Sequence, residues 1–153
     1  MEKIMKDRSK RPLIALSGGF DPPNAGHTAM ILDASKIGDV MIILNSDDWC
    51  ARNRWNKKRF IAWEKRRDIL MEIPGVVSVV PVDDSDDTVC SALESLKPDF
   101  FGNGGSRTVM NTPEVDFCKK MNIGTVWFLG STVTEEAQQI TYDAIKKANG
   151  VDK

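Results

Sequence analysis

Five apolar segments alternate with helical patterns along the chain, and this alternation limits the possible folds more than any other feature of the sequence. The segments span residues 12–17, 40–45, 76–82, 99–102 and 125–130, and they are rich in β-branched or aromatic residues. Strands that are covered on both faces have this composition. Apolar residues at steps of three and four predict helices over 26–37, 58–72, 86–96, 113–121 and 132–148. We therefore predict an α/β protein with a single doubly wound parallel sheet of about five strands.

The totals of the sequence narrow the class of protein further. The chain has 153 residues, of which 41% are hydrophobic and 28% charged, and this composition predicts one soluble globular domain. A net charge of −1 argues against a general nucleic-acid binder. No apolar run approaches the roughly 18 residues of a membrane helix. The 3 cysteines form no metal-binding pair, so we expect free thiols in a cytoplasmic protein. We interpret residues 1–11 as a flexible basic arm ahead of a domain over 12–150.

A turn rich in glycine and proline connects the first apolar segment to the first helical pattern. Ligands of doubly wound sheets bind beyond the carboxyl ends of the strands, where this turn lies. Gly18 and Gly19 permit close approach of the backbone. Gly26 and His27 fall near the start of the helix, where free N–H groups and the helix dipole attract anions. The residues alone leave two interpretations open, a phosphate pocket or a tight turn with a capping histidine.

Five segments, in order, resemble those of the cytidylyltransferase-like nucleotidyltransferases, which are Rossmann-like α/β enzymes of the HUP type. GGFDPPNAGH (18–27) resembles the family signature GxFDxxHxGH. GDVMIILNSD (38–47) and KKRFIAWEKRRDIL (57–70) are similar to segments of glycerol-3-phosphate cytidylyltransferases and ADP-heptose synthases. KPDFFGNGGSR (97–107) and GSTVTEEAQQI (130–140) are similar to two later segments of the heptose enzymes. The resemblance implies a Rossmann-like nucleotidyltransferase domain.

The resemblance also implies a reaction. Enzymes of this family move CMP or AMP from a nucleoside triphosphate (CTP or ATP) to a small phosphorylated acceptor such as a sugar or polyol phosphate. The acceptor phosphate attacks the α-phosphorus in line and pyrophosphate leaves, so the protein contributes positioning and charge stabilisation. Mg²⁺ is expected together with the triphosphate. Relatives form homodimers or larger assemblies, and neither nucleic acid nor a membrane is expected as a partner.

Matching positions assign the site residues that the resemblance implies. His27, Asn24 and Lys57 are the expected catalytic residues, and His27 would donate to the triphosphate near the scissile bond. Asp21 either orients the turn or approaches the metal, and no other residue is expected to bind a metal. Arg66 either contacts phosphate or fixes its helix against the basic loop. The full set of expected nucleotide-binding residues is Gly18, Gly19, Phe20, Asp21, Gly26, Lys58, Arg66, Gly104, Gly105, Ser131 and Thr132.

Two further segments carry expected contacts to the nucleotide. In the run ARNRWNKKR (51–59), Lys57 and Lys58 match basic residues that reach over the phosphates, and Arg52 and Arg54 are weaker candidates. Ser131 and Thr132 precede the last helical pattern, where Thr132 and Glu135 have the spacing of a capping box.

Two other functions stay open beside a sugar-phosphate enzyme. The pair Asp21-Pro22 resembles the signature GxFDPxTxGH of the adenylyltransferase branch, which leaves open an adenylyltransferase of coenzyme synthesis, acting on pantetheine phosphate or nicotinamide mononucleotide. The family has His, or Thr in that branch, where this chain has Asn24. An amide donates a hydrogen bond but carries no charge, so a nucleotide-binding protein with reduced activity is the other alternative.

Overall fold

The fold is an alternating series of strands and helices in one parallel sheet. The computed structural model describes residues 11–105, 107, 108 and 110–150. Its elements are β1 (Leu13–Gly18), α2 (Ala25–Ser35), β2 (Asp39–Leu44), α3 (Asp47–Arg52), α4 (Trp63–Met71), β3 (Val76–Val80), α5 (Cys90–Leu96), β4 (Phe100–Gly104), α6 (Glu114–Lys120), β5 (Gly124–Leu129) and α7 (Glu135–Ala148). The 5 strands pair in parallel in the order β3-β2-β1-β4-β5. The predicted doubly wound, Rossmann-like sheet is confirmed.

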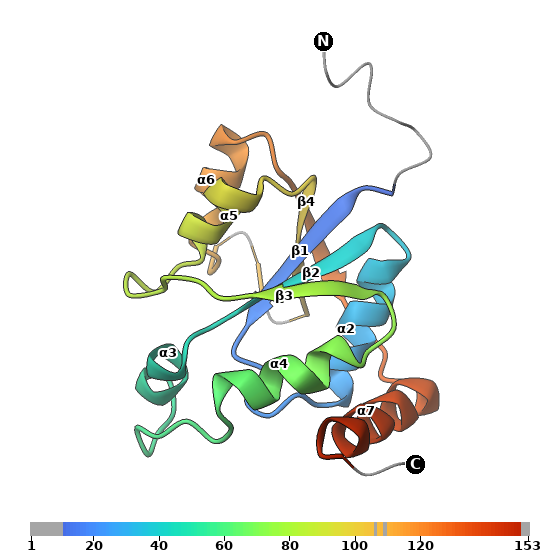
Figure 1. The fold of residues 1–153 in the computed structure, drawn as a ribbon. Helices are drawn as coiled ribbons and strands as arrows, with labels where there is room; N and C mark the ends of the chain where they lie inside the picture. Colours follow the sequence, from blue (N-terminus) through green and yellow to red (C-terminus); the bar gives the residue numbers. More distant parts are fainter. Residues whose placement is uncertain (1–10, 106, 109, 151–153) are drawn as a thin grey trace.

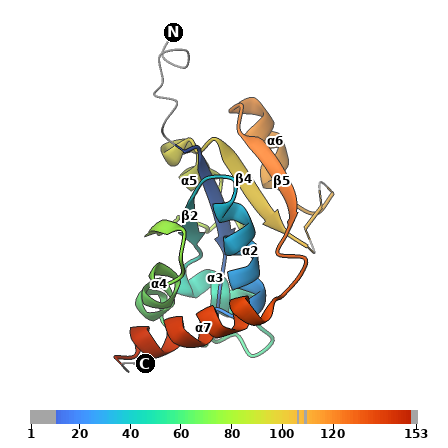
Figure 2. The same ribbon diagram turned by 90° about the vertical axis from the view of Figure 1, so that its right-hand side faces the viewer.

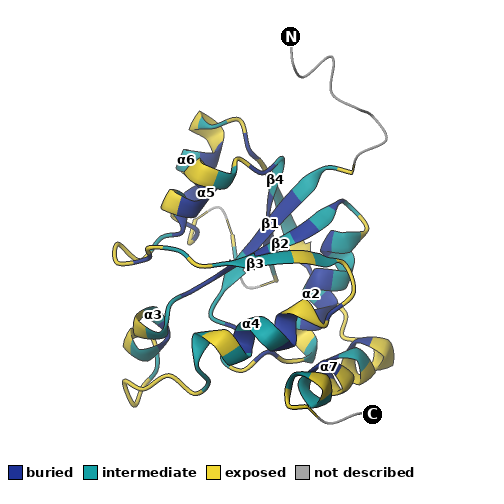
Figure 3. Cartoon of the chain, in the orientation of Figure 1, coloured by how far each residue is buried: buried dark blue, intermediate teal, exposed yellow. Residues whose placement is uncertain are grey.

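Helices cover both faces of the sheet. Helices α2, α4 and α7 lie on one face, and α5 and α6 lie on the other (Figures 1 and 2). In β1, Ile14 and Leu16 pack into the core beneath α2, α4 and α7, while Ala15 between them packs into the core beneath α5 and α6. Consecutive residues of β1 are therefore buried on opposite faces. Figure 3 shows that the strands at the centre of the sheet consist mainly of buried and half-buried residues. This double burial explains why the strand segments are apolar without alternation.

The order of the strands places a switch point beside the first strand. The chain runs outward from β1 through β2 to β3, then returns to β4 on the other side of β1 and ends at β5. The crossovers leave the carboxyl ends of β1 and β4 in opposite directions, which makes this pair of strands the switch point of the sheet. Helix α2 starts at Ala25, directly after the turn that leaves β1. The glycine- and proline-rich turn therefore lies where sheets of this type bind ligands.

The structure corrects several predicted helix boundaries. The helix predicted over 58–72 begins at Trp63, and the helix predicted over 86–96 begins at Cys90. The helix predicted over 132–148 begins at Glu135, because the hydroxyl of Thr134 accepts the N–H of Ala137 at 3.1 Å and caps it. The capping box predicted for Thr132 is therefore wrong. Helix α3 was not predicted at all.

The predicted arm over 1–11 lies outside the described residues except for Arg11, whose guanidinium contacts the Ser35 carbonyl and the Asp39 carboxylate. Its flexibility stays a prediction. Across residues 11–105, 107–108 and 110–150, no helix has both the length and the apolar character needed to cross a bilayer.

Candidate functional site

The turn after β1 is shaped by close packing against α3. A Cβ added at Gly19 would lie 3.1 Å from the ring of Trp49 and 3.2 Å from the sulfur of Cys50, so glycine lets the turn approach α3. Burial raises the pKa of the Cys50 thiol to about 11, so the thiol stays protonated near neutral pH. Phe20 follows in a left-handed conformation with φ 47° and is buried. The turn therefore packs closely against α3 and places the buried Phe20 ring beside the start of α2.

His27 is held at the start of α2 by a reciprocal pair of hydrogen bonds. The N–H of His27 donates to Oδ1 of Asn24 at 3.0 Å, and the N–H of Asn24 donates to Nδ1 of His27 at 3.2 Å. The imidazole also packs edge-on against Phe20, with ring centroids 4.6 Å apart. Burial lowers the pKa of His27 to about 4, because the charged form loses its hydration. The ring is therefore neutral at pH 7.

A hollow of about 300 Å³ lies in front of this helix start. The turn after β1, the first turn of α2 and the α3 segment enclose it together. Its walls are formed by Gly19, Phe20, Asp21, Pro22, Asn24, His27, Trp49, Cys50, Asn53 and Arg54. Five of the predicted site residues thus meet at one hollow: Gly19, Phe20, Asp21, Asn24 and His27.

Arg54 supplies the positive charge at this hollow. Its Nη1 donates to the carbonyl of Asp21 at 3.1 Å, and its guanidinium lies 5.8 Å from the centre of the Phe60 ring. Its Nε is buried and has no hydrogen-bond partner within the described part of the chain. A buried donor without a partner is costly, and the residue as a whole lines the hollow, so its guanidinium is the cation nearest to a ligand bound there. The sequence had ranked Arg54 below Lys57 and Lys58.

Lys57 and Lys58 lie on the exposed side of the same loop and do not line the hollow. The ammonium of Lys57 donates to the carbonyl of Arg52 at 3.2 Å, at the end of α3. Arg52 itself is engaged with the Asp84 carbonyl at 3.0 Å and the Asp87 carboxylate at 2.9 Å. The contribution of Lys57 and Lys58 to nucleotide binding stays a prediction.

Asp21 and Arg66, for which the sequence left two roles open, both hold the loops in place. Oδ2 and Oδ1 of Asp21 accept the N–H groups of Phe60 and Ile61 at 2.7 and 2.6 Å. The side chain of Arg66 is fully buried. It donates to the carbonyls of Ile61, Gly19 and Asn45 at 3.0, 2.6 and 3.0 Å and to the carboxylate of Asp47 at 2.8 Å. Of the two roles left open for Arg66, the structure shows the second, a link between its helix and the loops. Its contact with a nucleotide stays a prediction.

The remaining predicted residues do not line the hollow, and some of them lie beside later turns of α2. A Cβ at Gly104 would lie 3.3 Å from the sulfur of Met30, whereas at Gly105 it would meet open space. The N–H of Gly130 donates to Oδ2 of Asp33 at 2.7 Å, which ties the turn after β5 to α2. Ser131 and Thr132, just beyond that turn, are exposed. Gly18 and Gly26 flank the hollow in the sequence but do not line it, and Ser106 of the GNGGSR segment lies outside the described residues.

Helix α3 forms one wall of the hollow, and the sequence pattern does not predict this helix. Trp49, Cys50 and Asn53 belong to α3 or to its end, and no periodic pattern predicts a helix of 6 residues. A capping signal was present, because Ser46 precedes Asp47 and Asp48 and its hydroxyl accepts the N–H of Trp49 at 3.0 Å.

The donor groups at the hollow suit an anion better than a bound metal. In the residues that the structure describes, no group of three or more His, Cys, Asp or Glu side chains is gathered as a metal site. Asp21 uses both carboxylate oxygens to accept loop N–H groups. The expected Mg²⁺ stays a prediction.

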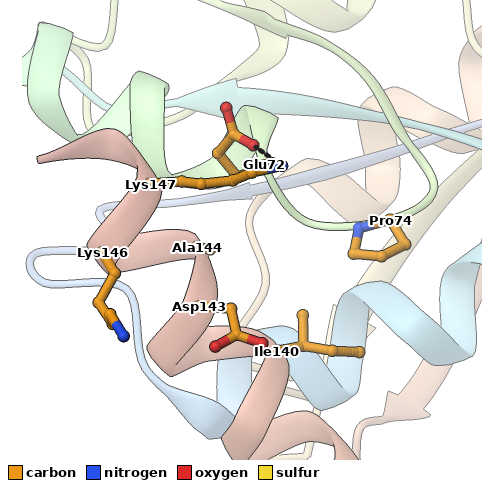
Figure 4. A pocket seen from close by; sticks show the side chains of 7 residues that line it. All are labelled: Glu72, Pro74, Ile140, Asp143, Ala144, Lys146 and Lys147. Atoms are coloured by element: carbon orange, nitrogen blue, oxygen red, sulfur yellow. Dashed lines mark ion pairs between the residues drawn. The ribbon is translucent and has the colours of Figure 1, made fainter. Parts of the chain in front are cut away.

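A second hollow of about 360 Å³ lies between the end of α4 and the second half of α7. Figure 4 shows Pro74, Ile140 and Ala144 with charged side chains around them. Glu72 and Lys147 form an ion pair there at 3.5 Å. None of the predicted site residues lines this hollow, so a substitution there is a suitable control for a substitution at the candidate site.

Comparisons with known proteins agree with the motifs and the fold. No protein-family model matches the sequence. The chain is 29% identical over 147 residues to the bifunctional protein HldE of Sulfurimonas denitrificans, which covers 94% of this chain and 30% of that protein. It is 28% identical over 123 residues to the HldE of Campylobacter fetus, covering 80% of this chain and 26% of the relative. The chain thus spans about a quarter to a third of the length of these relatives.

One solved structure shows the same fold. The crystal structure of the lipopolysaccharide core biosynthesis protein from Thermoplasma volcanium superposes with a TM-score of 0.62 at 21% sequence identity. The match covers 76% of this chain and 95% of that one. At this identity the likeness supports the architecture and leaves the chemistry to the residues of the hollow.

Proposed function

We propose that this chain, which is similar to the HldE proteins, belongs to the cytidylyltransferase-like nucleotidyltransferases and transfers CMP or AMP from a nucleoside triphosphate to a phosphorylated sugar or polyol. The observation that carries the proposal is the meeting of His27 and Arg54 at one hollow, at the N-terminus of α2 and beside the switch point of the sheet. A neutral donor, a cation and free helix N–H groups together suit a polyphosphate.

The roles of the two side chains follow from their hydrogen bonds. Nδ1 of His27 accepts an N–H, so Nε2 carries the proton of the neutral ring and is the nitrogen that donates to a ligand. Because the ring is neutral, Arg54 supplies the fixed positive charge. The guanidinium of Arg54 lines the hollow and would supply a charge-assisted hydrogen bond to a phosphate oxygen.

The proposed reaction is a single displacement at phosphorus. An oxygen of the acceptor phosphate forms a bond to the α-phosphorus of the triphosphate. The bond from the α-phosphorus to the bridging oxygen breaks, and its electron pair leaves with pyrophosphate. His27 and Arg54 would donate hydrogen bonds that stabilise the negative charge developing on the phosphoryl oxygens and the leaving group. Mg²⁺ bound to the triphosphate would stabilise the same charge.

The matches to HldE proteins support the sugar-phosphate branch over an adenylyltransferase of coenzyme synthesis. The identity of the base, the acceptor and any self-assembly belong to the proposal and are set by experiment. An acceptor screen separates the branches, because conversion of pantetheine phosphate or nicotinamide mononucleotide would favour the coenzyme branch.

Calorimetric titration with Mg²⁺-bound ATP, CTP, GTP and UTP tests the binding part of the proposal. Arg54→Ala should weaken binding of the preferred nucleotide by about 10- to 100-fold, the range for one charge-assisted hydrogen bond lost at a desolvated site. Lys147→Ala removes one cation at the remote hollow and should leave the affinity within about twofold, as expected of a surface charge. Equal affinities in the two variants would contradict the assignment of Arg54.

A further inference from the structure

We propose that Asn24 is a positioning residue, which holds His27 in a single neutral tautomer and does not itself contact the nucleotide. The inference rests on the proposed function for its catalytic consequence. Its structural part, that the side chain of Asn24 determines the tautomer of the His27 imidazole, can be measured without any substrate.

The reciprocal bonds between Asn24 and His27 fix which ring nitrogen carries the proton. A backbone N–H can only donate, so the bond from the N–H of Asn24 to Nδ1 of His27 requires an unprotonated Nδ1. The single proton of the neutral ring then resides on Nε2. The nitrogen left for a ligand is thereby always a donor, as a phosphate requires.

The side chain of Asn24 is what keeps its own backbone in place for this bond. Asn24 is exposed and lies in extended backbone at the cap of α2, with φ −140° and ψ 179°. Its Oδ1 accepts the N–H of His27, three residues on, which closes the cap. If this acceptor is lost, the cap residue is free to turn away and its N–H no longer has to meet Nδ1.

Gly26 leaves room for the cap oxygen. A Cβ added at Gly26 would lie 3.2 Å from Oδ1 of Asn24, closer than most real contacts of a Cβ atom. The helix start thus has space for an oxygen at this point, and the glycine is explained by the cap without assigning it to the nucleotide.

This role explains how Asn24 stands in the signature where the family has His. The oxygen of the side chain is engaged within α2, so the residue acts through His27 and the cation of the site is Arg54. Asn24 therefore need not replace the positive charge of a histidine. A second catalytic contact at this position is not required by the geometry.

Two substitutions separate the cap oxygen from the amide group. Asn24→Ser keeps a short oxygen that can cap a helix but removes the amide, whereas Asn24→Gln keeps the amide on a side chain that is not a good cap. Asn24→Ala removes both. The chain has 1 histidine, so the imidazole ¹⁵N spectrum reports His27 alone.

The first readout is the ¹⁵N spectrum at pH 8, where the ring is neutral in every variant. The wild type and Asn24→Ser should show protonated Nε2 and unprotonated Nδ1, while Asn24→Gln and Asn24→Ala should show averaged signals of two tautomers. The same ordered spectrum in all four proteins would overturn the proposal, whatever reaction the protein catalyses.

The second readout is nucleotide-dependent turnover. With the cap retained, Asn24→Ser should keep kcat within about threefold of the wild type, while Asn24→Gln and Asn24→Ala should lose at least tenfold in kcat with little change in KM. A normal rate in Asn24→Gln together with a large loss in Asn24→Ser would show that the amide contacts the nucleotide directly. Failure of all four proteins to turn over would count against the proposed function, and the spectra would still decide the role of Asn24.

Discussion

Replacing Arg66 by methionine tests whether this arginine is a structural link. The side chain is fully buried and makes four hydrogen bonds, three to carbonyls of different loops and one to Asp47. Methionine fills much of the volume but leaves these acceptors without a donor. Breaking a buried ion pair costs about 3–5 kcal/mol, and the partial exposure of Asp47, 39%, places the expected loss near the lower end. Domains of this size have about 5–15 kcal/mol in total, so Arg66→Met should fold with a much reduced margin.

Urea denaturation followed by circular dichroism measures this loss. With an m-value of about 2 kcal/mol per molar urea, the midpoint should fall by roughly 1.5 M. Arg67→Met is the matched control, because Arg67 is the next residue of α4, is 41% exposed and contacts residues of its own helix, Asp68 by an ion pair and the Trp63 ring at 5.6 Å. Its midpoint should change by less than about 0.5 M, as expected for a surface pair. Similar midpoints for the two variants would refute the reasoning.

Three further predictions follow from the site and its surroundings. Because burial lowers the pKa of His27 to about 4 from 6.5, the unfolded chain binds this proton first as the pH falls. Part of the stability should be lost between pH 6.5 and 4, and His27→Gln should lack that part in pH-dependent denaturation. Asp21→Ala should raise the amide exchange rate of Phe60 at least tenfold, and unchanged protection would show that other contacts hold the loop. Gly130→Ala should lower the free energy of unfolding by more than about 2 kcal/mol, because φ is 72° and the new Cβ would lie 2.6 Å from the Met30 nitrogen. Gly150→Ala is the control, because φ is 77° but a Cβ would meet open space, and it should lower the free energy of unfolding by only about 1 kcal/mol. Thermal unfolding measures both losses.

The central strands were predictable because they are buried on both faces. Residues of β1 and β2 alternate between two apolar cores, so the sequence shows a continuous apolar run that no exposed segment would have. The start of α4 was less predictable, because a side chain far away in the sequence contacts the loop that precedes it. The carboxylate of Asp21 binds the loop at Phe60 and Ile61 and delays α4 until Trp63.

The candidate site was predicted in part. The signature located the turn, the helix start and His27 at the hollow, because these lie within ten consecutive residues. The choice among the basic residues of the loop needed three dimensions. Helix α3 turns Arg54 toward the hollow and leaves Lys57 on its outer side, and six residues without an apolar period do not reveal such a helix.

Asn24 shows how a local rule can be overlooked inside a family motif. Asn followed three residues later by a residue that can bond back is a helix-start signal. The resemblance to the family signature predicts a catalytic contact with phosphate at this position instead. Read as a cap, Asn24 explains the tautomer of His27, and the departure from the signature no longer implies a weakened enzyme.

Pyrophosphate release is the most direct test of the proposed function. The protein is incubated with each Mg²⁺-bound nucleoside triphosphate and with sugar, polyol and coenzyme-precursor phosphates, and pyrophosphate is measured with and without His27→Ala and Arg54→Ala. We expect release with one triphosphate and one class of acceptor, and a loss of about 10²–10³ in kcat/KM in each variant. Absence of pyrophosphate with every pair, or release that neither variant reduces, would contradict the account of this hollow as a nucleotidyltransferase site.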